Sequence, residues 1–147
     1  MNKDDVTIKH CKVSDKVEVS YHVISADRDY KLEDGDQPHP DLVEAIKAFQ
    51  NDLAFAFLHD DNEKIEAFKA SGFTITENMG VTHIVITGSV KTVHDRTVGL
   101  SSGKIPVDVE DKKDPLTKKI DKAIEELYQF TFKGKKSQQE IDFDEEK

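Results

Sequence analysis

The sequence predicts an α+β domain, in which helices cover one face of an antiparallel sheet of about five strands. Three observations lead to this prediction. Some short segments carry apolar residues at every second position, which is typical of strands with one buried face. Others carry them at spacings of three and four, which indicates amphipathic helices. The segments follow one another in the order ββα(α)βββα, which favours antiparallel pairing with the helices packed on one side.

Residues 6–13 and 17–24 are rich in β-branched and aromatic residues and are predicted to form a hairpin. Residues 14–16 between them are polar and are expected to form its turn. The next stretch, residues 26–40, is acidic and contains glycine and proline. We therefore expect it to be an exposed loop.

The most regular segment of the chain begins at Pro40. Proline is well placed in the first turn of a helix, where its missing N–H costs nothing. Apolar residues then recur at helical spacing to about Leu58, which predicts one amphipathic helix. A second, short helix is predicted from Asn62, with Phe68 on its apolar side, and is expected to end at Gly72.

From residue 73 onward the apolar pattern changes to a period of two. Residues 73–79, 81–92 and 97–107 are rich in valine, isoleucine and threonine and are separated by turn-forming residues. They are predicted to be three consecutive antiparallel strands.

A final helix is expected to begin at Asp114, a capping residue followed by Pro115, and to end at Gly134. The prediction is thus a single domain over residues 1–134. Residues 135–147 have no apolar periodicity and a strong negative charge, so we expect an acidic tail that is disordered in isolation.

Composition argues against several functional classes. The chain has 147 residues and a formal net charge of −9, which argues against simple adhesion to DNA or to acidic membranes. Cys11 is the only cysteine, so no disulfide can form within the chain and a reducing compartment is expected. Residues 1–10 lack an apolar signal segment, and the longest apolar run, residues 53–58, is too short to span a bilayer. A cytoplasmic protein is expected.

The body of the chain lacks a recognisable catalytic motif. Residues 99–104 superficially resemble a phosphate-binding loop, but three residues rather than four separate the glycines, and Ile105 stands where serine or threonine is needed. The histidines do not have the spacings of metal ligands. We therefore expect no enzyme activity, no metal and no cofactor. An unrecognised hydrolase that uses His59, Asp60 or Asp61 with a divalent ion is an alternative.

The tail carries two large apolar residues among acids. Gln138, Ile141 and Phe143 resemble the peptide Gln-Leu-x-Leu-x-Phe, by which many bacterial DNA polymerases and repair proteins dock on the sliding clamp. Gln139 departs from this pattern, because an aliphatic residue is usual there. Such a peptide inserts its apolar side chains into a pocket on the partner, and the glutamine amide fixes the register. Alternatively, Ile141 and Phe143 add an edge strand to the protein's own sheet.

Residues 112–136 contain eight lysines and four acids, a local basic excess in an acidic chain. Such a surface is a candidate for gripping single-stranded DNA. The alternative is the solvated face of a helix. The candidate residues are Lys118, Lys119, Lys122, Lys133, Lys135 and Lys136.

Two segments, THIVITGSV at residues 82–90 and ELYQFTFKGKKSQQEIDFDEE at residues 126–146, together resemble a group of small, mostly uncharacterised bacteriophage proteins encoded among replication and recombination genes. The resemblance implies a non-enzymatic accessory protein of DNA metabolism in the bacterial host cytoplasm, and it supplies no catalytic residues. The alternative class is a small-ligand-binding or host-inhibitory phage protein that acts through the sheet face and the acidic residues 27–36.

Overall fold

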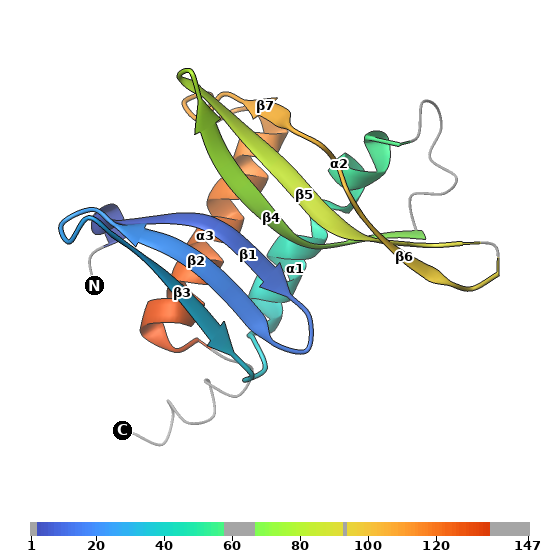
Figure 1. The fold of residues 1–147 in the computed structure, drawn as a ribbon, viewed down its shortest axis with the longest axis horizontal. Coiled ribbons are helices and arrows are strands. Elements are labelled where there is room, and N and C mark those ends of the chain that lie inside the picture. The colour runs from blue at the N-terminus through green and yellow to red at the C-terminus, as the bar shows by residue number, and fades with distance from the viewer. Residues whose placement is uncertain (1–2, 58–66, 93, 136–147) are drawn as a thin grey trace.

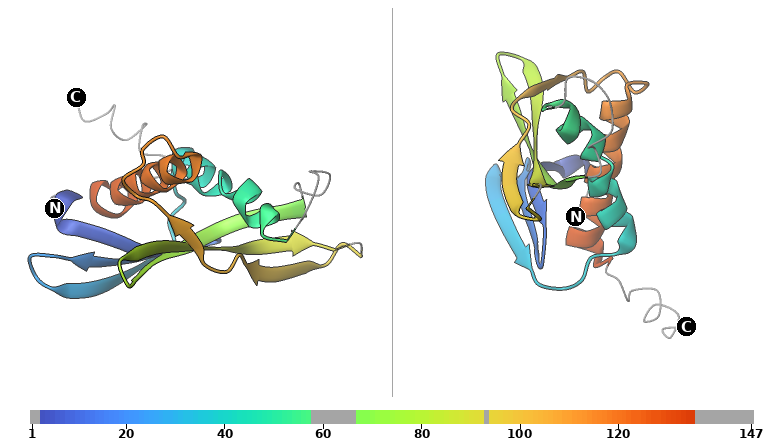
Figure 2. Two further views of the ribbon diagram at one scale, coloured as in Figure 1. Left: turned by 90° about the horizontal axis from the view of Figure 1, so that it is seen from above. Right: turned by 90° about the vertical axis from the view of Figure 1, so that its right-hand side faces the viewer.

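The structure, a computed structural model, describes residues 3–57, 67–92 and 94–135 of the chain. It confirms the α+β class. A seven-stranded antiparallel sheet forms one layer, and the helices form a second layer on one of its faces (Figures 1 and 2). The elements in chain order are η1 (Lys3–Asp5), β1 (Val6–Val13), β2 (Val17–Val23), β3 (Arg28–Asp34), α1 (Pro40–Lys47), α2 (Gln50–Phe55), β4 (Phe68–Asn78), β5 (Val81–Lys91), β6 (Thr97–Ser101), β7 (Ile105–Val107) and α3 (Pro115–Lys133).

The sheet consists of two strand groups. The strand order is β3-β2-β1-β4-β5-β6, and β7 also pairs with β5. The first group is therefore β1 to β3 and the second is β4 to β7. Among the described residues, the strand pairing that joins the groups is that of β1 with β4, through His10–Thr74, Cys11–Phe73 and Lys12–Gly72. We call these three residue pairs the seam.

The core lies between the sheet and the helices. Alternate residues of β1, β2, β4 and β5 face the helix layer, where they meet the apolar sides of α1, α2 and α3. Burial of these apolar side chains is the main term that stabilises the two-layer arrangement. The largest fully buried apolar side chains are those of Phe49, Phe73, Phe130, Leu42, Ile46, Leu53, Ile84, Ile86 and Leu127.

The first departure from the sequence prediction is β3. Residues 28–34, predicted to belong to an exposed loop, form a strand that pairs with β2 from Val17–Asp34 to Val23–Arg28. This strand lies at the edge of the sheet, where charged residues are favoured because they discourage pairing with other molecules. Backbone hydrogen bonds hold β3 to β2, and they do not require alternating apolar side chains. The acidic composition of this segment therefore predicts a loop although a strand forms.

The predicted helix from Pro40 to Leu58 is divided in two. α1 ends at Lys47 and α2 begins at Gln50. Between them the Phe49 N–H donates to the carbonyl of Ile46 at 3.1 Å, a tighter turn than that of an α-helix. The Phe49 side chain is fully buried, so the break serves packing that a regular period cannot reveal.

The second predicted helix is wrong over its last residues. Phe68 and Gly72 belong to β4, which begins at Phe68 and pairs with β5 along its whole length. The start of that predicted helix, near Asn62, lies outside the described residues. The single strand predicted over residues 97–107 is also divided, into β6 and β7.

The boundaries of the last helix are confirmed. The side chain of Asp114 accepts a hydrogen bond from the Leu116 N–H at 2.9 Å, and Pro115 occupies the first turn. Gly134 ends α3 in the left-handed conformation, with φ of 68°. Glycine adopts this conformation without the steric penalty of a side chain, so α3 stops where the sequence predicts.

Candidate functional site

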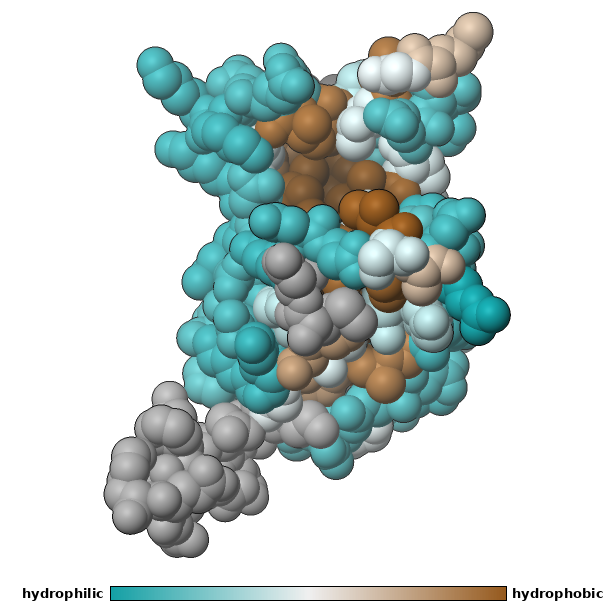
Figure 3. Space-filling view, turned by 90° about the vertical axis from the view of Figure 1, so that its left-hand side faces the viewer, coloured by the Kyte–Doolittle hydropathy of each residue, from teal (hydrophilic) through white to brown (hydrophobic). Residues whose placement is uncertain are grey.

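A cleft separates the two strand groups beyond the seam. β1 and β4 pair at His10–Lys12, and the remaining parts, residues 6–9 and 75–78, do not pair with each other. In Figure 1 the two strand groups diverge on the left of the view. Figure 3, seen from that side, shows a hollow with hydrophobic residues at its base. The cleft has a volume of about 810 Å³, which is within the usual range for ligand sites.

The local backbone explains why the strands meet at the seam and then separate. Each strand has a register shift close to the seam, between Ile8 and His10 in β1 and between Ala70 and Gly72 in β4. A bulge bends its strand and increases the local twist. At the seam itself the backbones approach closely, since a Cβ on Gly72 would lie 2.1 Å from the carbonyl oxygen of Cys11. Only glycine permits that approach.

Cys11 belongs to the seam, and its side chain is not exposed to solvent in the cleft. It is fully buried, and this burial raises the pKa of its thiol to about 12. A thiol that stays protonated at neutral pH is a poor nucleophile and a poor metal ligand. Cys11 is therefore a packing residue.

The walls of the cleft are strands and its base is helix α3. β1 forms one wall, and β4 and β5 form the other. Isoleucines and valines provide most of the base, with threonines and a few charged groups nearer the rim. The lining includes Ile8, His10, Thr74, Ile75, His83, Ile120 and Ile124, with Lys9, Glu77 and Asp121 as its charged residues.

Two histidines supply polar groups to the cleft. His10 Nδ1 lies 2.7 Å from Thr74 Oγ1, a hydrogen bond that joins the two walls at the seam. His83 Nδ1 is buried and has no hydrogen-bond partner within the described residues. A buried polar atom without a partner costs free energy. Because His83 Nδ1 is itself buried, a molecule in the cleft reaches it only if the side chain moves.

The far end of the β4–β5 wall carries an exposed apolar residue in an unusual conformation. Met79 has φ of 56° and Gly80 has φ of 81°, which are the positive values of a type I′ hairpin turn. Asparagine, aspartate or glycine is the usual choice at the first of these positions. Met79 is instead 96% exposed, so packing within the described structure does not explain the choice.

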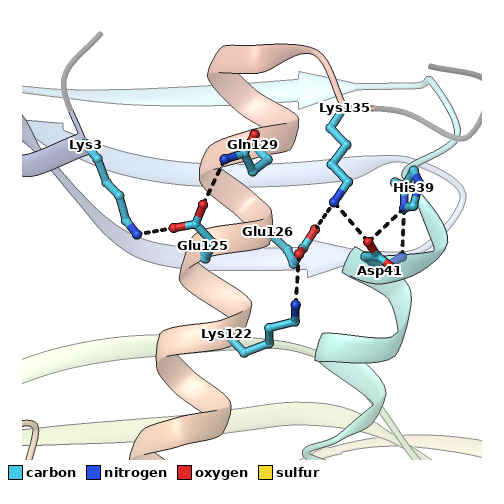
Figure 4. A network of polar contacts seen from close by, with 8 residues as sticks. All are labelled: Lys3, His39, Asp41, Lys122, Glu125, Glu126, Gln129 and Lys135. Carbon is cyan, nitrogen blue, oxygen red and sulfur yellow. Dashed lines mark hydrogen bonds and ion pairs between the residues drawn. The ribbon is translucent and has the colours of Figure 1, made fainter. Parts of the chain in front are cut away.

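A second feature is the point where the chain leaves α3 (Figure 4). Lys135 Nζ donates to Asp41 Oδ2 at 3.0 Å and to Glu126 Oε1 at 3.1 Å. The hydrogen bond to Asp41 raises the pKa of Lys135, and the same bond lowers the pKa of Asp41. Glu126, which is 4% exposed, also accepts from Lys122 Nζ at 3.2 Å. We call Lys135, Asp41 and Glu126 the anchor, because they tie the start of the tail to α1 and α3.

Figure 4 also shows an ion pair on the opposite side of α3. Glu125 accepts from Lys3 and from Gln129, and these contacts, with that of Lys3 the larger, lower the pKa of Glu125. The ion pair holds the start of the described chain against α3. Both side chains are exposed, so the ion pair contributes little stability, and β1 is placed by its pairing with β2 and β4.

The predicted lysines do not form one free basic surface. Lys119 Nζ pairs with Asp52 at 2.8 Å, Lys122 pairs with Glu126, and Lys135 belongs to the anchor. Lys118 and Lys133 are exposed on α3. The remaining predicted residues lie outside the described part of the chain, namely Lys136, Gln138, Ile141, Phe143, His59, Asp60 and Asp61.

The cleft is not predicted by any pattern in the sequence. Its lining comes from β1, β4, β5 and α3, and none of these segments carries a motif. The only signal in the sequence was Gly72 inside a stretch of strand-forming residues, which can mark a bulge or a close backbone approach. The helical spacing before Gly72 instead predicts a helix end there.

Within the described ranges, no three His, Cys, Asp or Glu side chains lie together as metal ligands would. Nor does any helix in this part of the chain have the length and apolar character needed to cross a bilayer. No model of a known protein family, no curated protein sequence and no solved structure matches the chain. Its function is therefore inferred from its own residues.

Proposed function

We propose that this chain is a non-enzymatic accessory protein of bacteriophage DNA replication or recombination. Through Gln138, Ile141 and Phe143 it docks on a protein partner such as the bacterial sliding clamp. The resemblance of residues 138–143 to clamp-binding peptides supports the sliding clamp as the partner. The isoleucine and the phenylalanine enter an apolar pocket, and the glutamine amide sets the register.

The observation that carries the proposal is the anchor. Lys135 is tied to Asp41 and to Glu126, and the proposed docking peptide begins three residues later. Because an extended residue spans at most about 3.3–3.6 Å, the partner would be held within roughly 10 Å of the anchor. A short tether of this kind keeps the folded domain close to whatever the tail binds.

Contact with single-stranded DNA is the further part of this proposal. Lys119, Lys122 and Lys135 are engaged in ion pairs, so the contact would depend on Lys118, Lys133 and Lys136. Binding through about three charges is expected to be weak and to fall only moderately with salt, by about 20-fold between 50 and 200 mM, because the slope for single strands is about −0.7 for each phosphate neutralised. A fluorescence anisotropy titration of a labelled oligonucleotide at two salt concentrations measures it. Affinity that does not change with salt would contradict the DNA contact.

The docking proposal is tested by titrating a purified bacterial sliding clamp with the full chain in a calorimeter. We expect micromolar affinity for the natural sequence. The double variant Ile141→Ala with Phe143→Ala should bind at least about 10-fold more weakly, because each buried side chain contributes about 1.5–3 kcal/mol.

The matched control is Glu145→Gln with Glu146→Gln, which alters the same tail outside the peptide. It should change affinity less than about 3-fold, since exposed charges contribute little. Equal binding by the natural chain and the Ile141/Phe143 double variant would overturn the docking proposal, as would no binding by either.

A further inference from the structure

The cleft presents two strand edges that face each other without a strand between them. Residues 6–8 of β1 pair on their other side with β2, Lys9 lies at the register shift, and residues 75–78 of β4 pair on their other side with β5. Within the described residues, no strand pairs with the edges that face the cleft. Backbone N–H and C=O groups on such edges are best satisfied by an extended peptide, which offers donors and acceptors at the strand repeat.

The base of the cleft selects the side chains of such a peptide. Ile120 is 4% exposed and Ile8 is 3% exposed, while Ile75 and Ile124 are only partly buried. Side chains on alternate residues of a strand point to the same face. A peptide that fits therefore carries apolar side chains at every second position and polar side chains between them.

A segment of this chain has that pattern. Ile141 and Phe143 are two residues apart, and Glu140, Asp142 and Asp144 alternate with them. In an extended conformation the two apolar side chains share one face and the three acids share the other. The first face matches the isoleucines at the base of the cleft, and the acids would face solvent on the side of the sheet away from the helices.

The chain is long enough to reach the cleft. Ile124 lies nine residues before Lys133, the last residue of α3, which is about 14 Å along the helix axis. Crossing the helix adds roughly 10 Å, so the two offsets combine to roughly 17 Å. From Lys135, six residues lead to Ile141 and eight lead to Phe143. These lengths extend up to about 20 Å and 26 Å respectively.

We propose that residues 138–143 bind in the cleft of the same molecule, as an added strand between β1 and β4, with Ile141 and Phe143 over Ile75 and Ile124. The contact itself is argued from the strand edges and does not depend on the partner of the tail. One consequence does rest on the proposed function. The cleft and the clamp compete for the same two side chains, so occupancy of the cleft lowers the affinity for the clamp.

The contact is tested by methyl NMR on the full chain, with the isoleucine δ1 methyl groups as probes. Replacing Ile141 and Phe143 together by serine should shift the signals of Ile75 and Ile124, which lose their neighbours. The control probe is Ile46, which is buried in α1 at 2% exposure and should not shift. Unchanged signals of Ile75 and Ile124 would overturn the proposal.

Two further measurements distinguish other occupants. The signals of the natural chain should be independent of protein concentration, whereas a shift on dilution would assign the cleft to the tail of a second copy and overturn the contact within one molecule. Native mass spectrometry of the purified chain should give the mass of the protein alone. A bound small molecule that is lost from the variant Ile124→Lys would assign the cleft to that ligand instead.

The competition is tested separately with the variant Ile124→Ser and the sliding clamp. This substitution leaves the tail intact and weakens its site in the cleft. In the natural chain we expect most tails to occupy the cleft, so the variant should bind the clamp about 5- to 10-fold more tightly. If the methyl signals shift as expected and the clamp binds neither the natural chain nor Ile124→Ser, the proposed function fails while the cleft contact stands. If the clamp binds both proteins equally and the methyl signals stay fixed, the cleft contact fails and the proposed function stands.

Discussion

The seam and the cleft are two parts of one boundary, which β1 and β4 form together. The two strands pair at the seam and lie apart at the cleft. At the seam β1 and β4 pair through three residue pairs, with Gly72 against Cys11 and a fully buried thiol. At the cleft the strands have separated, and α3 contributes Ile120 and Ile124 to the space between them. Close approach at one residue thus joins the two strand groups, while the bend beside it opens a site.

The outer edges of the sheet and the edges inside the cleft also differ in their suitability for binding a peptide strand. The outer strand β3 carries charged residues such as Lys31 and Glu33, and such charges discourage unwanted pairing. The opposite outer strand, β6, has none between Thr97 and Ser101. The edges inside the cleft carry Lys9 and Glu77 beside Thr7, Ile8, Ile75 and Thr76. A recessed edge that combines few charges with an apolar base is suited to one specific peptide.

The largest expected effect comes from adding a side chain where the backbones of Gly72 and Cys11 lie in close contact at the seam. In Gly72→Ala the new Cβ would lie 2.1 Å from the Cys11 carbonyl oxygen. Since backbone must move to relieve this overlap, we expect the free energy of unfolding to fall by about 3 kcal/mol, at the upper end of overpacking costs. Urea denaturation followed by circular dichroism measures it.

Gly99→Ala is the matched control for that substitution. Gly99 lies in β6, and a Cβ there would be 3.9 Å from the nearest atom, the carbonyl oxygen of Gly88. Its stability should change by less than about 0.5 kcal/mol. Similar losses in the two variants would show that the seam is not the tight point between the strand groups.

A smaller effect is expected at the point where seam and cleft meet. Thr74→Val removes the partner of His10 Nδ1, which lies 2.7 Å from the threonine hydroxyl. The loss should be about 1–2 kcal/mol, because a half-buried polar atom is left without its hydrogen bond. Thermal unfolding measures it, and Thr76→Val, at the next position on the same face of β4, should be close to neutral. A larger loss for Thr76→Val would contradict the proposed role of the His10–Thr74 bond.

At the far end of the cleft a substitution is expected to stabilise the protein. Met79→Asn places a residue that tolerates positive φ before Gly80, which is the preferred pair in a type I′ turn. Met79 is 96% exposed, so little packing is lost and the free energy of unfolding should rise by about 0.5–1 kcal/mol. Chemical denaturation measures the gain. A loss of stability would mean that Met79 makes contacts that compensate for its strained backbone.

The smallest expected effect is the pH dependence of the anchor. Asp41 has its pKa lowered from 3.8 by Lys135, so its contribution is present above about pH 4 and is lost as pH falls through the lowered pKa. Lys135 has its pKa raised from 10.5, chiefly by Asp41, so its contribution is lost as pH rises through the raised pKa. NMR titration of the Asp41 carboxyl carbon measures the first of these, and Lys135→Gln should return that pKa toward 3.8. An unchanged pKa in the variant would show that the ion pair does not form in solution.

The sequence by itself determined the α+β class, most of the strands and the limits of the last helix. Period-two and helical patterns report which residues face a core, and this information is local. The ends of α3 are equally local, since Asp114, Pro115 and Gly134 act on the backbone beside them. The docking peptide in the tail stays a prediction, because its residues lie outside the described structure.

Only the tertiary structure decided that residues 28–34 form β3, that the first helix divides before Phe49, and that β1 and β4 separate beyond the seam. Each depends on a contact between residues distant in sequence. β3 is held by the ladder with β2, the helix break by burial of Phe49, and the cleft by the approach of Gly72 to Cys11. A bulge shifts the alternation by one residue, as between the buried Ile8 and Cys11, but such a shift does not say which strand lies alongside or where the two strands separate. For that physical reason the site could not be predicted from the sequence.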